Sequence, residues 1–261
     1  ENGKPVLNRI QVAEKMYATY QLEATDKGGH SSVPTSTNPV YALSSALTAL
    51  GNYHFPVKLS DVTKTYFQRS AGFAQGQQSA DMKEVAGGSP SPEAVQRLSA
   101  SPLYNATMRT TCVATEVNGG HAANALPQAA RATINCRILP HDDPAEVEAQ
   151  LRKLTENERV KLKVINQPLK SPASPMRPDV MKSVEGITAE MWPGVPVVPV
   201  MSTGATDSRF MRNAGIPMYG VSGLFTEPGD ARAHGLDERV AIPRLYDGRE
   251  FLYKLVKALS Q

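Results

Sequence analysis

Residues 14–52 read EKMYATYQLEATDKGGHSSVPTSTNPVYALSSALTALGN and carry, in order, the signals of a strand, a tight turn and a helix. Residues 14–25 alternate in character and contain aromatic side chains, which is typical of a β-strand. Gly28-Gly29 marks a turn, and residues 38–50 form an apolar-periodic run that begins at Asn-Pro and ends before Gly51. Proline at the first helical position and glycine just past the end are the usual punctuation of a helix. This stretch therefore predicts a strand followed by a helix.

The segments after this helix continue the pattern of a ferredoxin-like unit. Residues 105–117 (NATMRTTCVATEV) and 128–139 (QAARATINCRIL) are typical of strands, Asp142-Asp143-Pro144 begins a helix, and residues 159–165 (RVKLKVI) return as a strand. The expected order, β-α-β-β-α-β, is that of the ferredoxin-like unit. Residues 54–104 exceed what this unit needs. Their short helical runs predict a helical insertion, because a structureless loop of that length is unusual.

A Pro/Ser-rich stretch at residues 168–175 predicts a hinge, and the region after it has a different pattern of expected strands and helices. Strands alternating with helices indicate a parallel, helix-covered sheet, so we expect an α/β chain. The expected elements are a helix over 179–192, a strand over 195–201, a helix from Thr206-Asp207, a strand over 216–221 and a helix over 244–260. These strands are too few for a complete doubly wound domain, and we expect further material before Glu1.

Composition excludes some classes of function. The 261 residues suit one large domain or two modest ones, and 41% hydrophobic residues suffice for an ordinary core. The net charge is +3, with 28 basic and 25 acidic residues interleaved, so no basic stripe points to nucleic acid. No apolar run approaches the roughly 18 residues of a membrane span. The start at Glu1-Asn2-Gly3 has neither an initiator methionine nor a signal peptide, and we interpret it as an internal cut or a processed start.

The two cysteines, Cys112 and Cys136, each lie in a strand-like run. A disulfide requires that these strands are neighbours. Two buried thiols also suit residues that pack as small hydrophobes, and we favour that interpretation. The compartment therefore stays open between cytoplasmic and periplasmic or secreted.

Two of the five histidines lie in contexts that indicate chemistry. His30 follows Gly28-Gly29 in a turn that leaves a strand, where glycine lets the backbone approach a ligand closely. His234 lies in a loop with Asp237 and Glu238 close behind, and a neutral imidazole oriented by a carboxylate is a good zinc ligand. The alternatives are a surface turn histidine and a solvated loop histidine. More than 200 residues separate the two, so only folding or a second copy of the chain brings them together.

Three further positions could contact a ligand. Thr206 lies where a strand ends and a helix begins, a place at which free N–H groups and the helix dipole attract anions. The alternative is a plain N-cap at Thr206 or Asp207. Asn124 lies in the connection between two strands, and Arg137 lies near the end of the second, where the alternatives are a long hairpin connection and a solvated strand end.

Four stretches together resemble the di-zinc metallopeptidases that include aminoacylase, bacterial glutamate carboxypeptidase, yeast carboxypeptidase S and succinyl-diaminopimelate desuccinylase. They occur in the order of that family and cover nearly the whole chain. They are Gly29-His30-Ser31-Ser32-Val33-Pro34, then Asn124-Ala125-Leu126-Pro127 with Arg137, then Gly204-Ala205-Thr206-Asp207-Ser208-Arg209, and His234 with Glu238. The helical insertion looks more like the carboxypeptidase S branch.

The resemblance implies a lid that also mediates a homodimer, at about residues 12–167 with the insertion at 54–104. Residues 1–11 would be the end of a first catalytic-domain segment or a hinge, and residues 168–261 the C-terminal part of the catalytic domain. His30 would reach across the dimer and stabilise the oxyanion.

The remaining site residues follow from the same resemblance. Asn124 and Arg137 would bind substrate from the lid, with Arg137 gripping a carboxylate. Thr206 would line the substrate pocket, and His234 would be the last ligand of two zinc ions.

The sequence departs from that family in one large respect. It contains no HExxH and no Glu-Glu pair, which are usual metal-binding and base motifs, and we interpret His141, beside Asp142 and Asp143, as an ordinary surface residue. We therefore expect part of a zinc-dependent amidohydrolase that cleaves a peptide or an N-acyl amino acid near a free carboxylate. A missing N-terminal catalytic segment would complete it, and this chain alone would be inactive. The alternative is a non-catalytic module for dimerisation and ligand binding.

Overall fold

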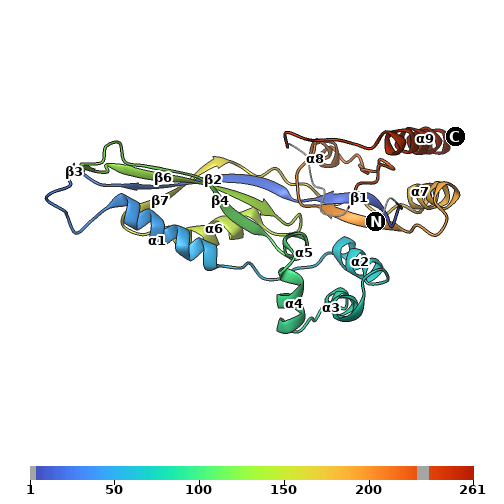
Figure 1. Cartoon of the computed structure of the whole chain (residues 1–261), viewed down its shortest axis with the longest axis horizontal. Coiled ribbons are helices and arrows are strands. Elements are labelled where there is room, and N and C mark those ends of the chain that lie inside the picture. The colour runs from blue at the N-terminus through green and yellow to red at the C-terminus, as the bar shows by residue number, and fades with distance from the viewer. Residues whose placement is uncertain (1–3, 228–234) are drawn as a thin grey trace.

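A four-stranded antiparallel sheet forms the centre of the computed structural model, which describes residues 4–227 and 235–261. Its order is β4-β6-β2-β7, so β2 and β6 are central (Figure 1). The strands are β2 (Met16–Thr25), β4 (Thr111–Gly119), β6 (Ala129–Ile138) and β7 (Val160–Asn166). Alternate residues of β2 are buried, including Ala18, Tyr20 and Leu22, because successive side chains of a strand point to opposite faces.

Two helices cover one face of this sheet, α1 (Pro39–Asn52) and α6 (Pro144–Thr155) (Figure 1). The side chain of Asn38 caps the first turn of α1, and Leu43 and Leu50 lie on its buried face. From α6, Val147 and Leu151 join the same core. The chain order β2-α1-β4-β6-α6-β7 confirms the predicted ferredoxin-like unit, with the expected helical insertion between α1 and β4.

The insertion consists of α2 (Asp61–Ser70), α3 (Gly76–Ala86), α4 (Pro92–Ser99) and α5 (Pro102–Met108). Phe67, Met82 and Met108 lie in a small core of its own. The strand expected over 105–117 is wrong at its start, since α5 holds residues 105–108. A proline begins α5, and its helical spacing sends Met108 into the insertion core rather than into the sheet.

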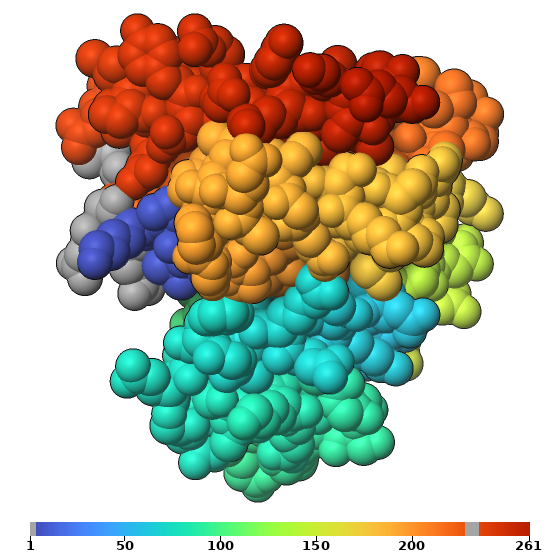
Figure 2. Space-filling model, turned by 90° about the vertical axis from the view of Figure 1, so that its right-hand side faces the viewer, coloured from blue at the N-terminus to red at the C-terminus, as the bar shows by residue number. Residues whose placement is uncertain are grey.

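The C-terminal part is built on a two-stranded parallel sheet of β1 (Asn8–Glu14) and β8 (Val197–Ser202). The helices α7 (Pro178–Met191) and α9 (Ile242–Leu259) contribute to the core beside it, where Ile10, Val184 and Phe251 are buried. Helix α2 packs against β8, so the insertion also contacts the C-terminal part. Figure 2 shows the insertion directly below residues of the C-terminal part.

Two expectations for this region were incomplete. Residues 8–14 were not expected as a strand, and β1 pairs with β8 about 190 residues later. The strand expected over 216–221 is wrong, because only a single bridge joins Gly220 to Gln11. Pro217 has no N–H for a ladder, and Gly215 has a φ of 81°, so the backbone here is not continuously extended.

The two cysteines form a disulfide, which corrects the preference for two buried thiols. Cys112 of β4 and Cys136 of β6 are direct partners in the antiparallel register, with Cα atoms 4.1 Å apart. The register decides the pairing, because it places two side chains of adjacent strands on the same face.

No helix in residues 4–227 and 235–261 is long and apolar enough to cross a membrane.

Candidate functional site

His30 lies at the far tip of the sheet, in the short strand β3 (Gly29–His30), which pairs with β5 (Ala125–Leu126) (Figure 1). Gly28 precedes it with a φ of 75°, and a Cβ there would come within 2.7 Å of a Gln128 carbon. The exposed imidazole receives a hydrogen bond on Nδ1 from the Ser32 backbone N–H, at 3.2 Å. A nitrogen that accepts is not protonated, so the proton of the neutral ring is on Nε2. His30 thus has a donor on the side away from its own turn.

Asn124 lies beside His30 at this tip. The Asn124 carbonyl accepts a 3.0 Å hydrogen bond from the Ser31 N–H, and the neighbouring Ala125 is the strand partner of His30. Both predicted residues are exposed. Folding therefore brings together two polar residues that are more than 90 positions apart in the sequence.

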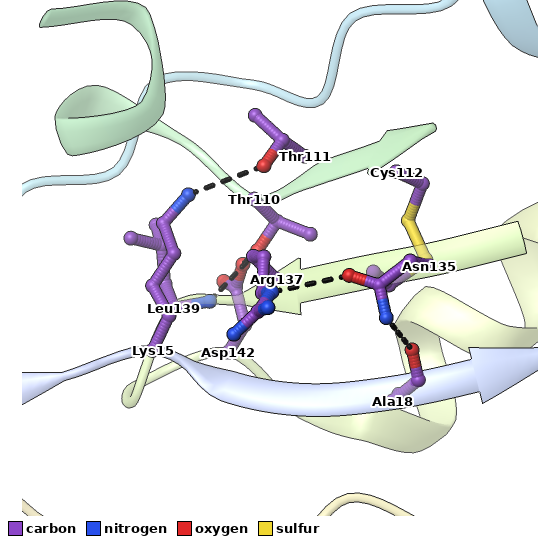
Figure 3. The surroundings of a disulfide bond; sticks show 10 residues. Lys15, Ala18, Thr110, Thr111, Cys112, Asn135, Arg137, Leu139 and Asp142 are labelled. Carbon is purple, nitrogen blue, oxygen red and sulfur yellow. Dashed lines mark hydrogen bonds between the residues drawn. A yellow bond between two sulfur atoms is a disulfide. The ribbon is translucent and has the colours of Figure 1, made fainter. Parts of the chain in front are cut away.

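Arg137 lies toward the other end of the sheet, where β6 is flanked by Tyr17 of β2 and Thr111 of β4. Its guanidinium lies 4.6 Å from the centroid of the Tyr17 ring, and Nε donates to Asn135 Oδ1 at 3.1 Å (Figure 3). Cation–π contact and hydrogen bonding hold the planar group in one orientation. Arg137 is half-buried, near the end of β6.

Thr206 lies in the loop that follows the carboxyl end of β8. Its backbone N–H and its hydroxyl donate to Glu14 Oε2 at 2.8 and 2.5 Å. Helix α8 (Ser208–Asn213) begins two residues later with Asp207 at its N-cap. Asp207 makes no side-chain cap, and Thr206 Oγ1 instead accepts from the Ser208 N–H at 3.2 Å. The helix start expected at Thr206-Asp207 therefore shifts to Ser208, with Thr206 serving both the helix and Glu14.

The four described candidates fall into two pairs, one beside each end of the four-stranded sheet. His30 and Asn124 lie at the tip, whereas Arg137 and Thr206 lie near the point where β1 passes into β2. Eight residue steps of β6 separate Ala129, beside the tip, from Arg137, which is about 27 Å at the usual rise of a strand. One chain alone cannot bring His30 to a ligand held by Arg137.

Sequence reasoning missed Glu14 and Lys15, the two residues at the passage from β1 to β2. Both are fully buried. Lys15 Nζ donates to the Arg109 carbonyl at 2.6 Å and lies 3.5 Å from Thr111 Oγ1 (Figure 3). Burial lowers the pKa of Lys15 to about 7, opposed by the charge of Asp142. The sequence did contain a signal for this pair, because two adjacent residues of opposite charge lie inside an apolar, strand-like run. Charged residues are almost never buried without partners.

A cavity of about 690 Å³ opens beside the carboxyl end of β8. Ser202 and Thr203 line it, together with Tyr66 and Leu103 of the insertion. The carboxyl end of a parallel strand is where ligands of α/β proteins bind. The insertion therefore reaches the same region as the loop of Thr206.

The predicted zinc ligand His234 lies outside the described residues. Within residues 4–227 and 235–261, no three His, Cys, Asp or Glu side chains gather in a way that could hold a metal ion. A closed zinc site needs about four such ligands, so these residues do not fit a zinc site by themselves.

Comparison with known proteins gives consistent results. The model of the peptidase dimerisation domain (M20) matches residues 12–163. The chain is 28% identical to the probable carboxypeptidase S-like protein 2 of Dictyostelium discoideum, covering 98% of this chain and 49% of that protein. It is 25% identical to the human N-fatty-acyl-amino acid synthase/hydrolase PM20D1, covering 98% and 52%. The chain thus spans about half the length of these relatives.

Among solved structures, the M20 family metallo-carboxypeptidase Sso-CP2 from Sulfolobus solfataricus superposes with a TM-score of 0.65. Its sequence identity is 18%, and the match covers 98% of this chain and 60% of that one. Human carnosine dipeptidase 1 superposes with a TM-score of 0.61 at 13% identity, covering 99% and 57%. These similarities show a shared fold.

Proposed function

The chain belongs to the M20 peptidase dimerisation-domain family, and on this premise we propose that it is the lid and the end of the catalytic domain of an amide hydrolase. The relatives are hydrolases of the carboxypeptidase and N-fatty-acyl-amino acid types. We propose a lid at about residues 12–167 and the C-terminal part of a catalytic domain at 168–261, after a first segment or hinge at 1–11. A peptide or an N-acyl amino acid is the proposed substrate class.

The observation that carries the proposal is the separation of the candidate residues into two ends of one sheet. We propose that the substrate carboxylate pairs with Arg137, whose orientation Tyr17 and Asn135 already hold. Thr206 would line the same end. The Nε2–H of His30 from a second copy would donate to the oxyanion that forms on the attacked carbonyl, with Asn124 beside it.

Strand β4 offers the surface for such a dimer. It is one of the two edge strands of the sheet, and its residues from Val113 to Gly119 are exposed, with Val117 61% exposed. An unpaired edge strand is a template for pairing with another chain. Two-fold pairing of β4 with itself is antiparallel, so Thr111 of one copy would lie across from Gly119 of the other. Because Thr111 neighbours Arg137 and Gly119 neighbours the tip, the pairing would bring His30 of one copy toward Arg137 of its partner.

Zinc dependence is part of the proposal, with two zinc ions in a complete site and His234 as one ligand. Support comes from the shared fold with Sso-CP2, a metallo-carboxypeptidase. A catalytic segment N-terminal to this chain would provide the remaining ligands, and this chain alone would lack activity.

Subunit exchange tests the proposal in the complete enzyme. His30→Ala should lower kcat by roughly 10²–10³-fold, the usual loss for one oxyanion donor, with zinc content unchanged. His234→Ala should lose metal first, and excess zinc should partly restore it. Hybrids of His30→Ala subunits with His234→Ala subunits should regain activity, because one site then combines an intact metal end with an intact His30. His54→Ala, at another exposed histidine, is the matched control and should behave as the unaltered enzyme.

Confirmed hybrids without recovered activity would contradict the cross-dimer site. The alternative function is a non-catalytic dimerisation and ligand-binding module. Absence of amide hydrolysis and of bound metal in every form of the protein, with the dimer intact, would favour that alternative.

A further inference from the structure

We propose that Glu14 is a positioning residue that holds the loop of Thr206 in its ligand-binding shape. The inference rests on the proposed function, in which Thr206 lines the substrate end of the site. It adds a residue of β1 that has no contact with substrate in that scheme. Glu14 would act through Thr206. It would couple the conformation of this loop to that of residues 14–16, where the chain enters the proposed lid.

The contacts of Glu14 are concentrated on the loop and its supports. Oε2 accepts from the Thr206 N–H at 2.8 Å and from the Thr206 hydroxyl at 2.5 Å. Oε1 accepts from the Ser171 hydroxyl at 3.1 Å and lies 3.3 Å from Arg212 Nη1. Gln11 Nε2 also donates to Oε2, at 3.3 Å. The carboxylate is fully buried, so these protein donors replace water.

Lys15 extends the arrangement in the opposite direction. Successive side chains of a strand point to opposite sides, and Lys15 donates to the Arg109 carbonyl at the end of the insertion. The Lys15 backbone N–H donates to the Ser202 carbonyl at 3.0 Å, at the last residue of β8. Two adjacent buried ionisable side chains therefore hold the passage from β1 to β2 in place, Glu14 against the Thr206 loop and Lys15 against the insertion.

The chemistry of this site requires a carboxylate at position 14. Each of its two oxygens receives donors, and a glutamine at this position would replace one oxygen with an NH₂ group. The Arg212 cation, 3.3 Å from Oε1, repels an NH₂ group, so this group would face Thr206, and a donor facing the Thr206 N–H leaves that buried amide unpaired. Glu14→Gln should therefore release one side of the arrangement while it preserves the size of the side chain.

Hydrogen exchange of the full chain tests the inference without relying on catalysis. Glu14→Gln should accelerate exchange of the Thr206 amide at least about tenfold, and Ser171→Ala, which removes a donor from the other oxygen, should leave that amide slow. The Tyr20 amide, deep in the central sheet, should stay protected in both variants and so report that the fold is intact. If Glu14→Gln leaves Thr206 exchange unchanged with Tyr20 protected, the inference is wrong.

The complete enzyme provides a second readout. Thr206→Val removes the hydroxyl donor and tests the contact from the loop side, in case Glu14→Gln does not fold. Glu14→Gln and Thr206→Val should each raise KM about tenfold with a smaller change in kcat. The double variant should have a KM no higher than that of the poorer single variant, because both substitutions break the same contact. Additive losses would overturn the inference. Absence of activity in the unaltered enzyme, together with the expected exchange result, would instead refute the proposed function.

Discussion

Replacing Lys15 with methionine should remove a pH-dependent part of the folding stability. Methionine has nearly the same length and no charge, so it preserves packing and eliminates the ionisable group. Lys15 is fully buried where β1 passes into β2, and its Nζ donates to the Arg109 carbonyl at 2.6 Å. Burial lowers its pKa from 10.5 to about 7 in the folded chain.

The sign follows from the protons bound in each state. Between pH 7 and 10.5 the unfolded chain keeps Lys15 protonated while the folded chain does not, so unfolding takes up a proton. The contribution of Lys15 to stability is therefore fully present above pH 10.5 and is lost as the pH falls toward 7. Each pH unit in this window corresponds to about 1.4 kcal/mol. From pH 7.5 to 9.5 the stability of the unaltered chain relative to Lys15→Met should rise by about 2–3 kcal/mol.

Urea unfolding at a series of pH values measures this difference. Lys161→Met, at an exposed lysine of β7, is the control and should keep the pH dependence of the unaltered chain. Parallel stability curves for the unaltered chain and Lys15→Met over this pH range would show that Lys15 stays charged in the folded state. That result would refute the reasoning from burial.

Two further predictions concern the sheet. The paired Cys112→Ala and Cys136→Ala substitutions should lower the free energy of unfolding by about 3.5 kcal/mol, since the disulfide closes a loop with a sequence separation of 24. Dithiothreitol should destabilise the unaltered chain in chemical unfolding and leave the double variant unaffected; equal sensitivity would argue against the disulfide. Val117→Lys should shift the sedimentation of a β4-paired dimer toward the monomer at about ten micromolar, because charge blocks edge pairing. Ile165→Lys on the opposite edge strand should leave the dimer intact, and dimer loss in both variants would contradict pairing through β4.

Local signals in the sequence were sufficient for most elements of the ferredoxin-like unit. Helix α1 begins at the predicted proline, and the alternation of residues 128–139 matches β6 (Ala129–Ile138). These elements depend on their own periodicity and punctuation, which a short window contains. The motifs around His30 and Asn124 were visible for the same reason, as glycine and proline turns between such elements.

Pairing over long distances required the tertiary structure. Residues 8–14 become a strand only because β8 lies beside them, and residues 216–221 are not a strand although they are apolar. Cys112 and Cys136 pair because the register of β4 and β6 sets them opposite each other. A strand gains its stability from a neighbour that its own sequence does not specify.

The candidate site divides in the same way. The sequence by itself identified His30, Asn124, Arg137 and Thr206 as residues with suitable chemistry. Only the structure showed that they lie in two pairs beside opposite ends of one sheet. It also showed that Glu14 is buried against the loop of Thr206, 192 positions away. The reason is physical: residue type determines which chemistry is available, whereas burial and distance depend on how segments remote in sequence pack together.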